Sequence, residues 1–225
     1  MNIRGARFMK AILYLLSFII FFNYSAYSEE WVDIYSNSGD KLQVALPEGY
    51  CDISHTDEGK YYLNHINITK ANIPQFKHAE AKIIYNLCGQ NFDYPVGYIL
   101  FNHKKHSSSY TQIELNKLES STLNKSFTNK IKQKVNKSHD LNSANIKVKS
   151  IGVPELIWED ENALIIYIKI NTNVEGVQYI EEITSSSILY RNYGIYMYIV
   201  QGESLGNTLQ NAQLLLNAAK LTKSR

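Results

Sequence analysis

The sequence predicts an α+β fold in which an antiparallel β-sheet is packed by a central amphipathic helix and a C-terminal helix. Residues 155–201 contain β-prone runs separated by short polar turns, which is typical of an antiparallel meander. Residues 111–136 and 207–221 carry apolar side chains at helical spacing. Strands that follow one another, combined with two amphipathic helices, favour a sheet covered by helices.

The first half of the chain begins with two predicted strands, 31–36 and 41–46, around a polar turn at 37–40. Residues 57–82 fit no single pattern. The stretch 79–87 has helical spacing, but its end at 83–88 also fits a strand. Residues 96–102 form an apolar and aromatic run that predicts a strand.

The central helix is predicted over 111–136, because six apolar residues recur every three to five positions. They are Leu115, Leu118, Leu123, Phe127, Ile131 and Val135. Lysines occupy the opposite face of this helix, and the polar stretch 138–145 predicts a loop.

The second half predicts a strand at 146–151, followed by a meander. Residues 154–158 lead through an acidic turn to a strand at 163–171, and further strands cover 177–190 and 195–201. The last helix, 207–221, has a predicted buried face made of Leu209, Ala212, Leu215, Leu216 and Ala219.

The N-terminus resembles an export signal. Arg4, Arg7 and Lys10 precede an apolar run at 11–22, and the small-x-small triplet 26–28 follows it. The run is short for a bilayer span, which needs about 20 apolar residues. We therefore expect a signal peptide over 1–28, cleaved near Ser28, with a retained anchor as the alternative. The expected product is a single periplasmic or secreted domain, 29–225, with a net charge of −1 (20 basic and 21 acidic residues).

The chain has two cysteines, Cys51 and Cys88. In an oxidising compartment an isolated pair is most simply one disulfide. Metal ligation and a reactive thiol are the competing interpretations, but neither cysteine has a second cysteine or a histidine at ligand spacing. We predict no metal and no cofactor.

The segment Leu46-Pro47-Glu48-Gly49-Tyr50 follows the first strand pair. It resembles the strand-Pro-x-Gly-aromatic entry of PsbP/Mog1-like domains. The order of the later elements (helix, long meander, terminal helix) is also similar to that family. The resemblance implies an α/β sandwich with a binding or assembly role, and it supplies no catalytic residues.

One motif points to catalysis. Residues 202–206, with Ser204 at their centre, match the G-x-S-x-G nucleophile elbow between a predicted strand and a predicted helix. An α/β-hydrolase needs its acid and its histidine after this serine, and no His, Asp or Glu follows it. We therefore expect a β–α turn and no catalytic residue. A serine hydrolase at Ser204 is the weakest alternative.

Charge is unevenly distributed along the sequence. Residues 104–149 carry a net charge of +7 (ten Lys, three acids), whereas residues 155–203 carry −6 (eight acids, two bases). The basic face predicts an anionic partner and the acidic turn a basic one, although a solvated surface explains both. The candidate charged binding residues are Lys130, Lys132, Lys134, Lys137, Glu159, Asp160 and Glu161.

Tyr196 and Tyr198 share one face of a predicted strand. Exposed, they would form an amphipathic contact patch, and otherwise they pack beneath a helix with the hydroxyl at the rim.

Together these features predict an exported, non-enzymatic protein of the bacterial periplasm or cell envelope. We expect its partner to be another envelope or secreted protein, bound in an envelope-assembly or toxin-immunity role. The alternative is a binder of anionic lipid or a small ligand through the basic helix. Export argues against nucleic acid as a partner.

Overall fold

The computed structural model describes residues 29–71, 78–90, 94–122, 128–129, 132–133, 136, 146–202 and 207–225. The predicted signal peptide over 1–28 lies outside these residues, and its cleavage stays a prediction. Within the described ranges, no helix combines the length and the apolar character that crossing a bilayer requires.

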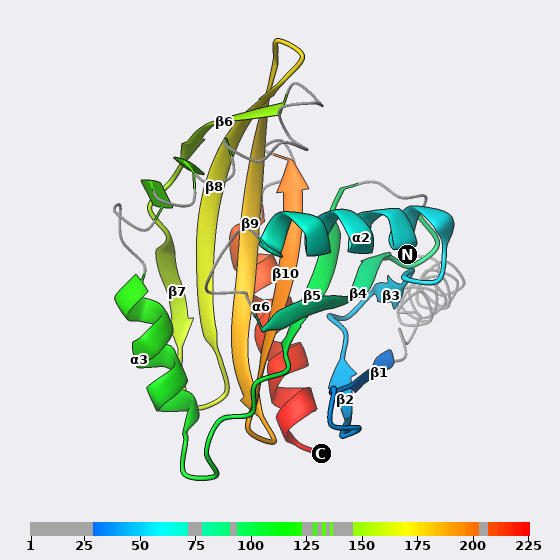
Figure 1. Cartoon of the computed structure of the whole chain (residues 1–225), viewed down its shortest axis with the longest axis vertical. Helices are drawn as coiled ribbons and strands as arrows, with labels where there is room; N and C mark the ends of the chain where they lie inside the picture. The colour runs from blue at the N-terminus through cyan, green and yellow to red at the C-terminus, as the bar shows by residue number, and fades with distance from the viewer. Residues whose placement is uncertain are drawn as a thin grey trace, which may run out of the picture.

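The fold is built on one eight-stranded antiparallel sheet in the order β3-β4-β5-β10-β9-β8-β6, with β7 also paired to β8 (Figure 1). Its strands are β3 (Tyr50–Asp52), β4 (Ala79–Leu87), β5 (Val96–Asn102), β6 (Ile146–Ile151), β7 (Glu155–Glu159), β8 (Leu164–Val174), β9 (Val177–Tyr190) and β10 (Tyr193–Gly202). The predicted meander is thus β8, β9 and β10, which are neighbours in the sheet.

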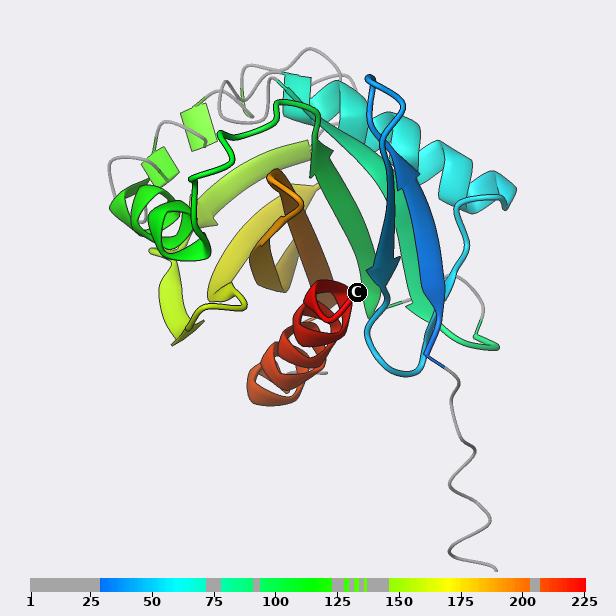
Figure 2. The ribbon, with the colours of Figure 1, turned by 90° about the horizontal axis from the view of Figure 1, so that it is seen from below.

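A separate hairpin and three described helices cover the sheet. Strands β1 (Trp31–Tyr35) and β2 (Lys41–Ala45) form the hairpin, and the helices are α2 (Asp57–Ala71), α3 (Gln112–Thr122) and α6 (Thr208–Lys223). Seen from below, the sheet curves around α6 and the hairpin, while α2 and α3 lie on its other side (Figure 2). We call these the α6 face and the α3 face. The predicted α+β class is confirmed.

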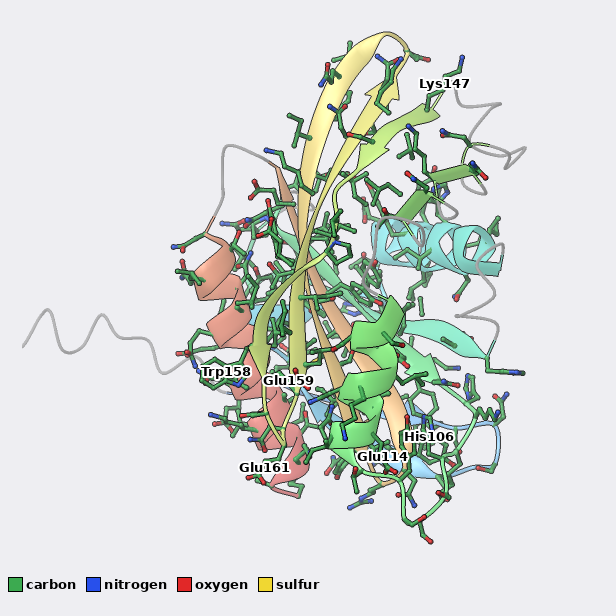
Figure 3. All side chains as sticks on the ribbon, turned by 90° about the vertical axis from the view of Figure 1, so that its left-hand side faces the viewer. His106, Glu114, Lys147, Trp158, Glu159 and Glu161 are labelled. Carbon is green, nitrogen blue, oxygen red and sulfur yellow. A yellow bond between two sulfur atoms is a disulfide. The ribbon has the colours of Figure 1, made fainter. Side chains whose placement is uncertain are left out.

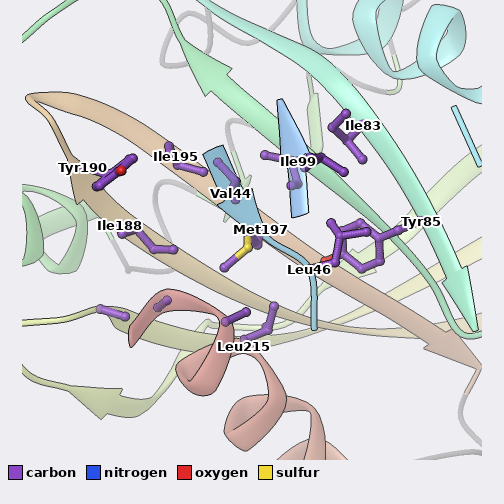
Figure 4. Close-up of a cluster of buried hydrophobic side chains, with 14 of the residues drawn as sticks. Val44, Leu46, Ile83, Tyr85, Ile99, Ile188, Tyr190, Ile195, Met197 and Leu215 are labelled. Carbon is purple, nitrogen blue, oxygen red and sulfur yellow. The ribbon is translucent and has the colours of Figure 1, made fainter. Parts of the chain in front are cut away.

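The main core lies between the α6 face, the hairpin and α6 itself (Figure 4). Ile195, Met197 and Ile199 alternate along β10 toward this core and are fully buried, and Leu215 of α6 packs among them. Burying apolar area of this kind stabilises by about 25 cal/mol per Å². Period-two alternation therefore fixes which side of β10 faces α6.

Two tight turns join the long strands of the meander. Glu175 and Gly176 connect β8 to β9, and Arg191 and Asn192 connect β9 to β10. All four residues have positive φ, between 49° and 93°. Two-residue hairpin turns with positive φ match the twist of the strands they join. The pairing of β9 with β10 accordingly has no register shift, from Tyr190 opposite Tyr193 to Glu181 opposite Gly202.

Helix α3 begins with a capping box. The hydroxyl of Thr111 accepts the backbone N–H of Glu114 at 3.2 Å, and the carboxylate of Glu114 accepts the backbone N–H of Thr111 at 2.7 Å. Thr56 caps α2 by accepting the N–H of Gly59 at 3.0 Å. Residues 79–87, which were ambiguous in sequence, form β4, which pairs with β3 on one side and with β5 on the other.

The predicted apolar stripe of the central helix is wrong at Leu118, which is 52% exposed. Leu115 is buried, but its inward neighbours are the amide side chains of Gln112 and Asn116. Leu123, Phe127, Ile131 and Val135 lie outside the described residues. The described part of the helix therefore packs through polar side chains on one side of Leu115.

In α6 the predicted buried face holds for its other four members but fails at Leu209, which is 74% exposed. Asn211 takes the inward position in the first turn of this helix. Its amide donates to the side-chain oxygen of Gln201 at 2.8 Å, and both residues are buried. A hydrogen-bonded amide replaces the expected leucine at this end of the core.

Candidate interaction edge at strand β7

Strand β7 forms an open edge of the sheet. It pairs with β8 on one side, and no strand of the described chain pairs with it on the other. Figure 3 shows this edge face-on, running between α6 and α3. The unpaired N–H and C=O groups of an edge strand can accept a further strand from another chain.

Two large apolar side chains flank this edge, Leu156 at 52% and Trp158 at 47% exposure. The register shifts between Leu156 and Trp158, so that Leu156 pairs with Ile166 and Trp158 pairs with Ile165. Because Ile165 and Ile166 point to opposite sides of the sheet, Leu156 lies on the α3 face and Trp158 on the α6 face. An added strand would meet an apolar side chain on each of its faces.

Asp160 fixes the turn that follows β7. Its carboxylate accepts the backbone N–H groups of Asn162 at 2.7 Å and Ala163 at 3.0 Å. Burial acts to raise the pKa of Asp160, but these bonds, together with one from the side chain of Trp158, outweigh it and lower the pKa. The turn that follows Trp158 is therefore held in place by Asp160.

Acidic side chains surround the apolar pair. Glu155, Glu159 and Glu161 are all exposed, and the last two are labelled in Figure 3. Lys223 donates its ammonium to the backbone carbonyl of Glu161, which leaves the carboxylate of Glu161 outside that contact. An apolar centre with an acidic rim suits a partner that presents an apolar side chain surrounded by basic residues.

Glu159, Asp160 and Glu161 lie together because they are adjacent in sequence, but their carboxylates have different surroundings. Glu159 and Glu161 are exposed at the edge. The carboxylate of Asp160 is engaged within the turn, so we assign it to positioning rather than to partner contact.

The basic candidates are described only in part. Lys132 is half-buried, and its carbonyl accepts the N–H of Asn136 at 3.0 Å. Lys130, Lys134 and Lys137 lie outside the described residues, as does Ser204. The lipid-binding helix and the serine-hydrolase alternative therefore stay predictions.

The predicted contact patch of Tyr196 and Tyr198 is wrong at Tyr196, which is 7% exposed. It packs with Leu100, Ala79 and Ala81, and its hydroxyl donates to Glu119 of α3 at 3.3 Å. Tyr198 is half-buried and stacks on Tyr98 with ring centroids 4.4 Å apart. Burial on the helix-covered α3 face, the second interpretation of these tyrosines, fits Tyr196.

Cys51 and Cys88 form a disulfide, with Cα atoms 5.0 Å apart. The bridge ties β3 to the residue after β4. Glu30 lies close to both sulfurs, but bonded sulfurs offer no thiolate for a metal. One oxygen of Glu30 instead accepts the N–H of Asp52 at 2.8 Å.

Sequence reasoning missed Leu156 and Trp158 as contact residues. The signal that could have found them is Gly152 and Pro154 directly before a short strand, because such breaks favour a strand at the sheet edge. A tryptophan beside three consecutive acidic residues adds to that signal.

Comparison with known proteins gives a likeness in structure but none in sequence. No protein-family model and no curated protein matches the sequence. The solution structure of cyanobacterial PsbP (CyanoP) from Synechocystis sp. PCC 6803 matches 88% of this chain and 94% of its own, at 10% identity and a TM-score of 0.42. This is a weak PsbP-like resemblance in fold, and no functional conclusion rests on it.

Proposed function

We propose that this chain is an exported, non-enzymatic protein that binds another protein through the β7 edge. The observation that carries the proposal is the exposed pair Leu156 and Trp158 on an unpartnered edge strand with an acidic rim. The partner is a protein that presents an extended segment with basic residues. It adds a strand to β7 by main-chain hydrogen bonds, with Trp158 as the central apolar contact.

Export is supported by two independent features. The N-terminal sequence has the order of a signal peptide, and the disulfide requires an oxidising compartment to persist. The intact mass of the exported protein tests this. We expect a chain that begins at Glu29 and lacks the two thiol hydrogens, whereas an uncleaved chain or two free thiols would contradict the periplasmic or secreted location.

Capture from an envelope extract of the source organism tests the edge itself. We expect a stoichiometric partner to be retained by the wild type and lost with Trp158→Ala, since removing a central tryptophan weakens binding by at least about tenfold. Leu209→Ala is the matched control, because Leu209 is also exposed but lies on α6. A partner that Trp158→Ala still retains would refute the edge, and no partner at all would refute the protein-binding role.

The salt dependence of partner retention and the identity of the captured protein test the proposal further. If the acidic rim steers the partner, retention falls as salt rises, and Glu159→Gln weakens it in the same direction. The proposal covers an envelope-assembly accessory and an immunity protein against a periplasmic toxin, and the identity of the captured protein separates these two roles.

A further inference from the structure

A second surface lies where the hairpin, the β9–β10 turn and the end of α6 meet. A pocket of about 400 Å³ opens there. Its lining consists of Lys41, Gln43, Tyr190, Arg191 and Arg225. Three of these five side chains are cationic, and they come from three segments far apart in the sequence. The fold therefore gathers a positive charge that the sequence does not reveal.

Arg225 is held in place on two sides. Its guanidinium carbon lies 4.1 Å from the centroid of the Trp31 ring, and its Nη1 donates to the side-chain oxygen of Gln43 at 2.7 Å. Stacking on an aromatic face leaves the edge of a guanidinium free to donate further hydrogen bonds. The contact with Gln43 uses one of its five N–H groups.

Arg191 is fixed by the turn that carries it. Its backbone adopts φ 49° in the two-residue connection between β9 and β10, and its guanidinium carbon lies 5.2 Å from the ring centroid of Tyr190. Among the described residues, no acidic side chain lies within ion-pair distance of Arg191 or Arg225. Two preorganised guanidiniums thus face one pocket without a described acidic counter-ion.

Lys41 is the third cation, and it is partly neutralised. Its ammonium lies 2.8 Å from a carboxylate oxygen of Asp33. With Asp33 included, the side chains around the pocket carry a formal charge of +2, from three cations and one anion. A dianion would balance this charge.

We propose that this pocket binds a phosphate-class dianion, either free or as a phosphomonoester group, through Arg191, Arg225 and Lys41. A phosphate offers three or more acceptor oxygens to two guanidinium forks and an ammonium, whereas a single carboxylate offers two. Gln43 links two of these charged groups, because its amide oxygen accepts from Arg225 and its amide N–H₂ donates to Asp33 at 3.2 Å.

Fluorescence titration of the purified full chain tests this directly. The chain has two tryptophans, Trp31 and Trp158, so a Trp158→Phe background leaves Trp31, stacked under Arg225, as the sole reporter. The probes are inorganic phosphate and glycerol phosphate at about pH 8, above the second phosphate pKa. Succinate at matched ionic strength serves as the dicarboxylate comparison. We expect saturable quenching or enhancement with both phosphates and weaker binding of succinate.

Substitutions locate the site. Arg191→Gln and Arg225→Gln should each weaken phosphate binding by at least about tenfold, because each removes charge-assisted hydrogen bonds. Lys117→Gln removes an exposed lysine of α3 and should leave binding unchanged. For Arg225→Gln, calorimetry replaces fluorescence because the reporter loses its stacking partner. Thermal unfolding confirms that each variant is folded.

Three results would overturn the proposal: no saturable response to phosphate, equal binding by both arginine variants and the wild type, or succinate binding as tightly as phosphate. Vesicles of phosphatidylcholine with and without phosphatidic acid distinguish the two sources. Co-sedimentation only with phosphatidic acid, and its loss in Arg191→Gln, places the phosphate on a membrane surface. Binding of glycerol phosphate without co-sedimentation identifies a soluble ligand.

Discussion

The α6 face of the sheet is packed mainly by apolar side chains, whereas the α3 face is joined to its helix by buried polar groups. Leu215, Ile195 and Met197 represent the first arrangement. On the second, Gln112 donates to the carbonyl of Ser187 at 3.0 Å and accepts the N–H of Leu189 at 2.6 Å. Apolar packing is strong but tolerates small shifts, while paired hydrogen bonds hold a helix at one position.

Asn116 continues the polar arrangement to the β7 edge. Its amide donates to the carbonyl of Asp160 at 2.9 Å and receives a hydrogen bond from Gln112 at 2.8 Å. The chain Ser187–Gln112–Asn116–Asp160 therefore links the middle of the sheet to the turn beside Trp158. The α6 face therefore supplies stability, and the α3 face positions the candidate edge.

The largest effect should follow from Leu215→Ala. Leu215 is fully buried against the α6 face, so its truncation should lower the free energy of unfolding by about 2–5 kcal/mol. Chemical denaturation measures the change. A loss below about 1 kcal/mol would mean that the α6 face does not dominate stability.

Gln112→Ala should cost less, about 1–3 kcal/mol, because it leaves the backbone groups of Ser187 and Leu189 without their partner. Gln112→Ala should also loosen the turn that follows β7, because Gln112 connects to this turn through Asn116. Hydrogen exchange at the turn 160–163 should accelerate in this variant and stay unchanged in Leu215→Ala after correction for global stability. Equal exchange in both variants would remove the distinction between the faces.

Glu119 gives the α3 face a pH dependence. Burial raises the pKa of Glu119, and the hydrogen bond from Tyr196 acts in the opposite direction. The folded state therefore binds the proton more tightly than the unfolded state, and stability falls as pH rises from the ordinary value of 4.5 through the raised pKa. Glu119→Gln should have a higher free energy of unfolding than the wild type at neutral pH.

This difference should vanish on acidification below the ordinary pKa, where Glu119 is protonated in both states. Denaturation curves across the acidic to neutral range measure it. A difference that stays constant with pH would show that the substitution acts through packing rather than through charge.

The smallest effect should follow from Leu118→Ala. Leu118 lies on α3 but is 52% exposed, so we expect a change within about 0.5 kcal/mol in the same denaturation assay. Together, Leu118→Ala and Gln112→Ala test an exposed apolar position and a buried polar position on the same helix. A large loss at Leu118 would restore the apolar stripe that the sequence predicted.

Strand positions on the α6 face could be predicted well, because alternation of apolar residues is a direct consequence of burial. The observed bounds of β5, β6 and β9 match the predicted ones. The disulfide followed from the cysteine count and the expected compartment. Helix α2 was not predicted, because it carries exposed tyrosines, Tyr61 and Tyr62, and shows little apolar periodicity.

The candidate sites were less predictable. Leu118 and Leu209 were assigned inward from apolar spacing, but the inward positions belong to amides whose partners lie on strands of the sheet. The exposed flanks of β7 depend on a bulge that shifts the register at one residue. The three cations of the pocket come from positions 41, 191 and 225, and only the closed fold places them together.

Two short strands, β6 and β7, share one edge of the sheet. Both strands pair with β8, β6 over Ile170–Val174 and β7 over Leu164–Tyr167, and residues 152–154 separate them. A docking segment that follows β7 reaches about five residues before the edge is interrupted. So short a footprint favours rapid dissociation, and it also denies other copies of the chain a long template for uncontrolled stacking.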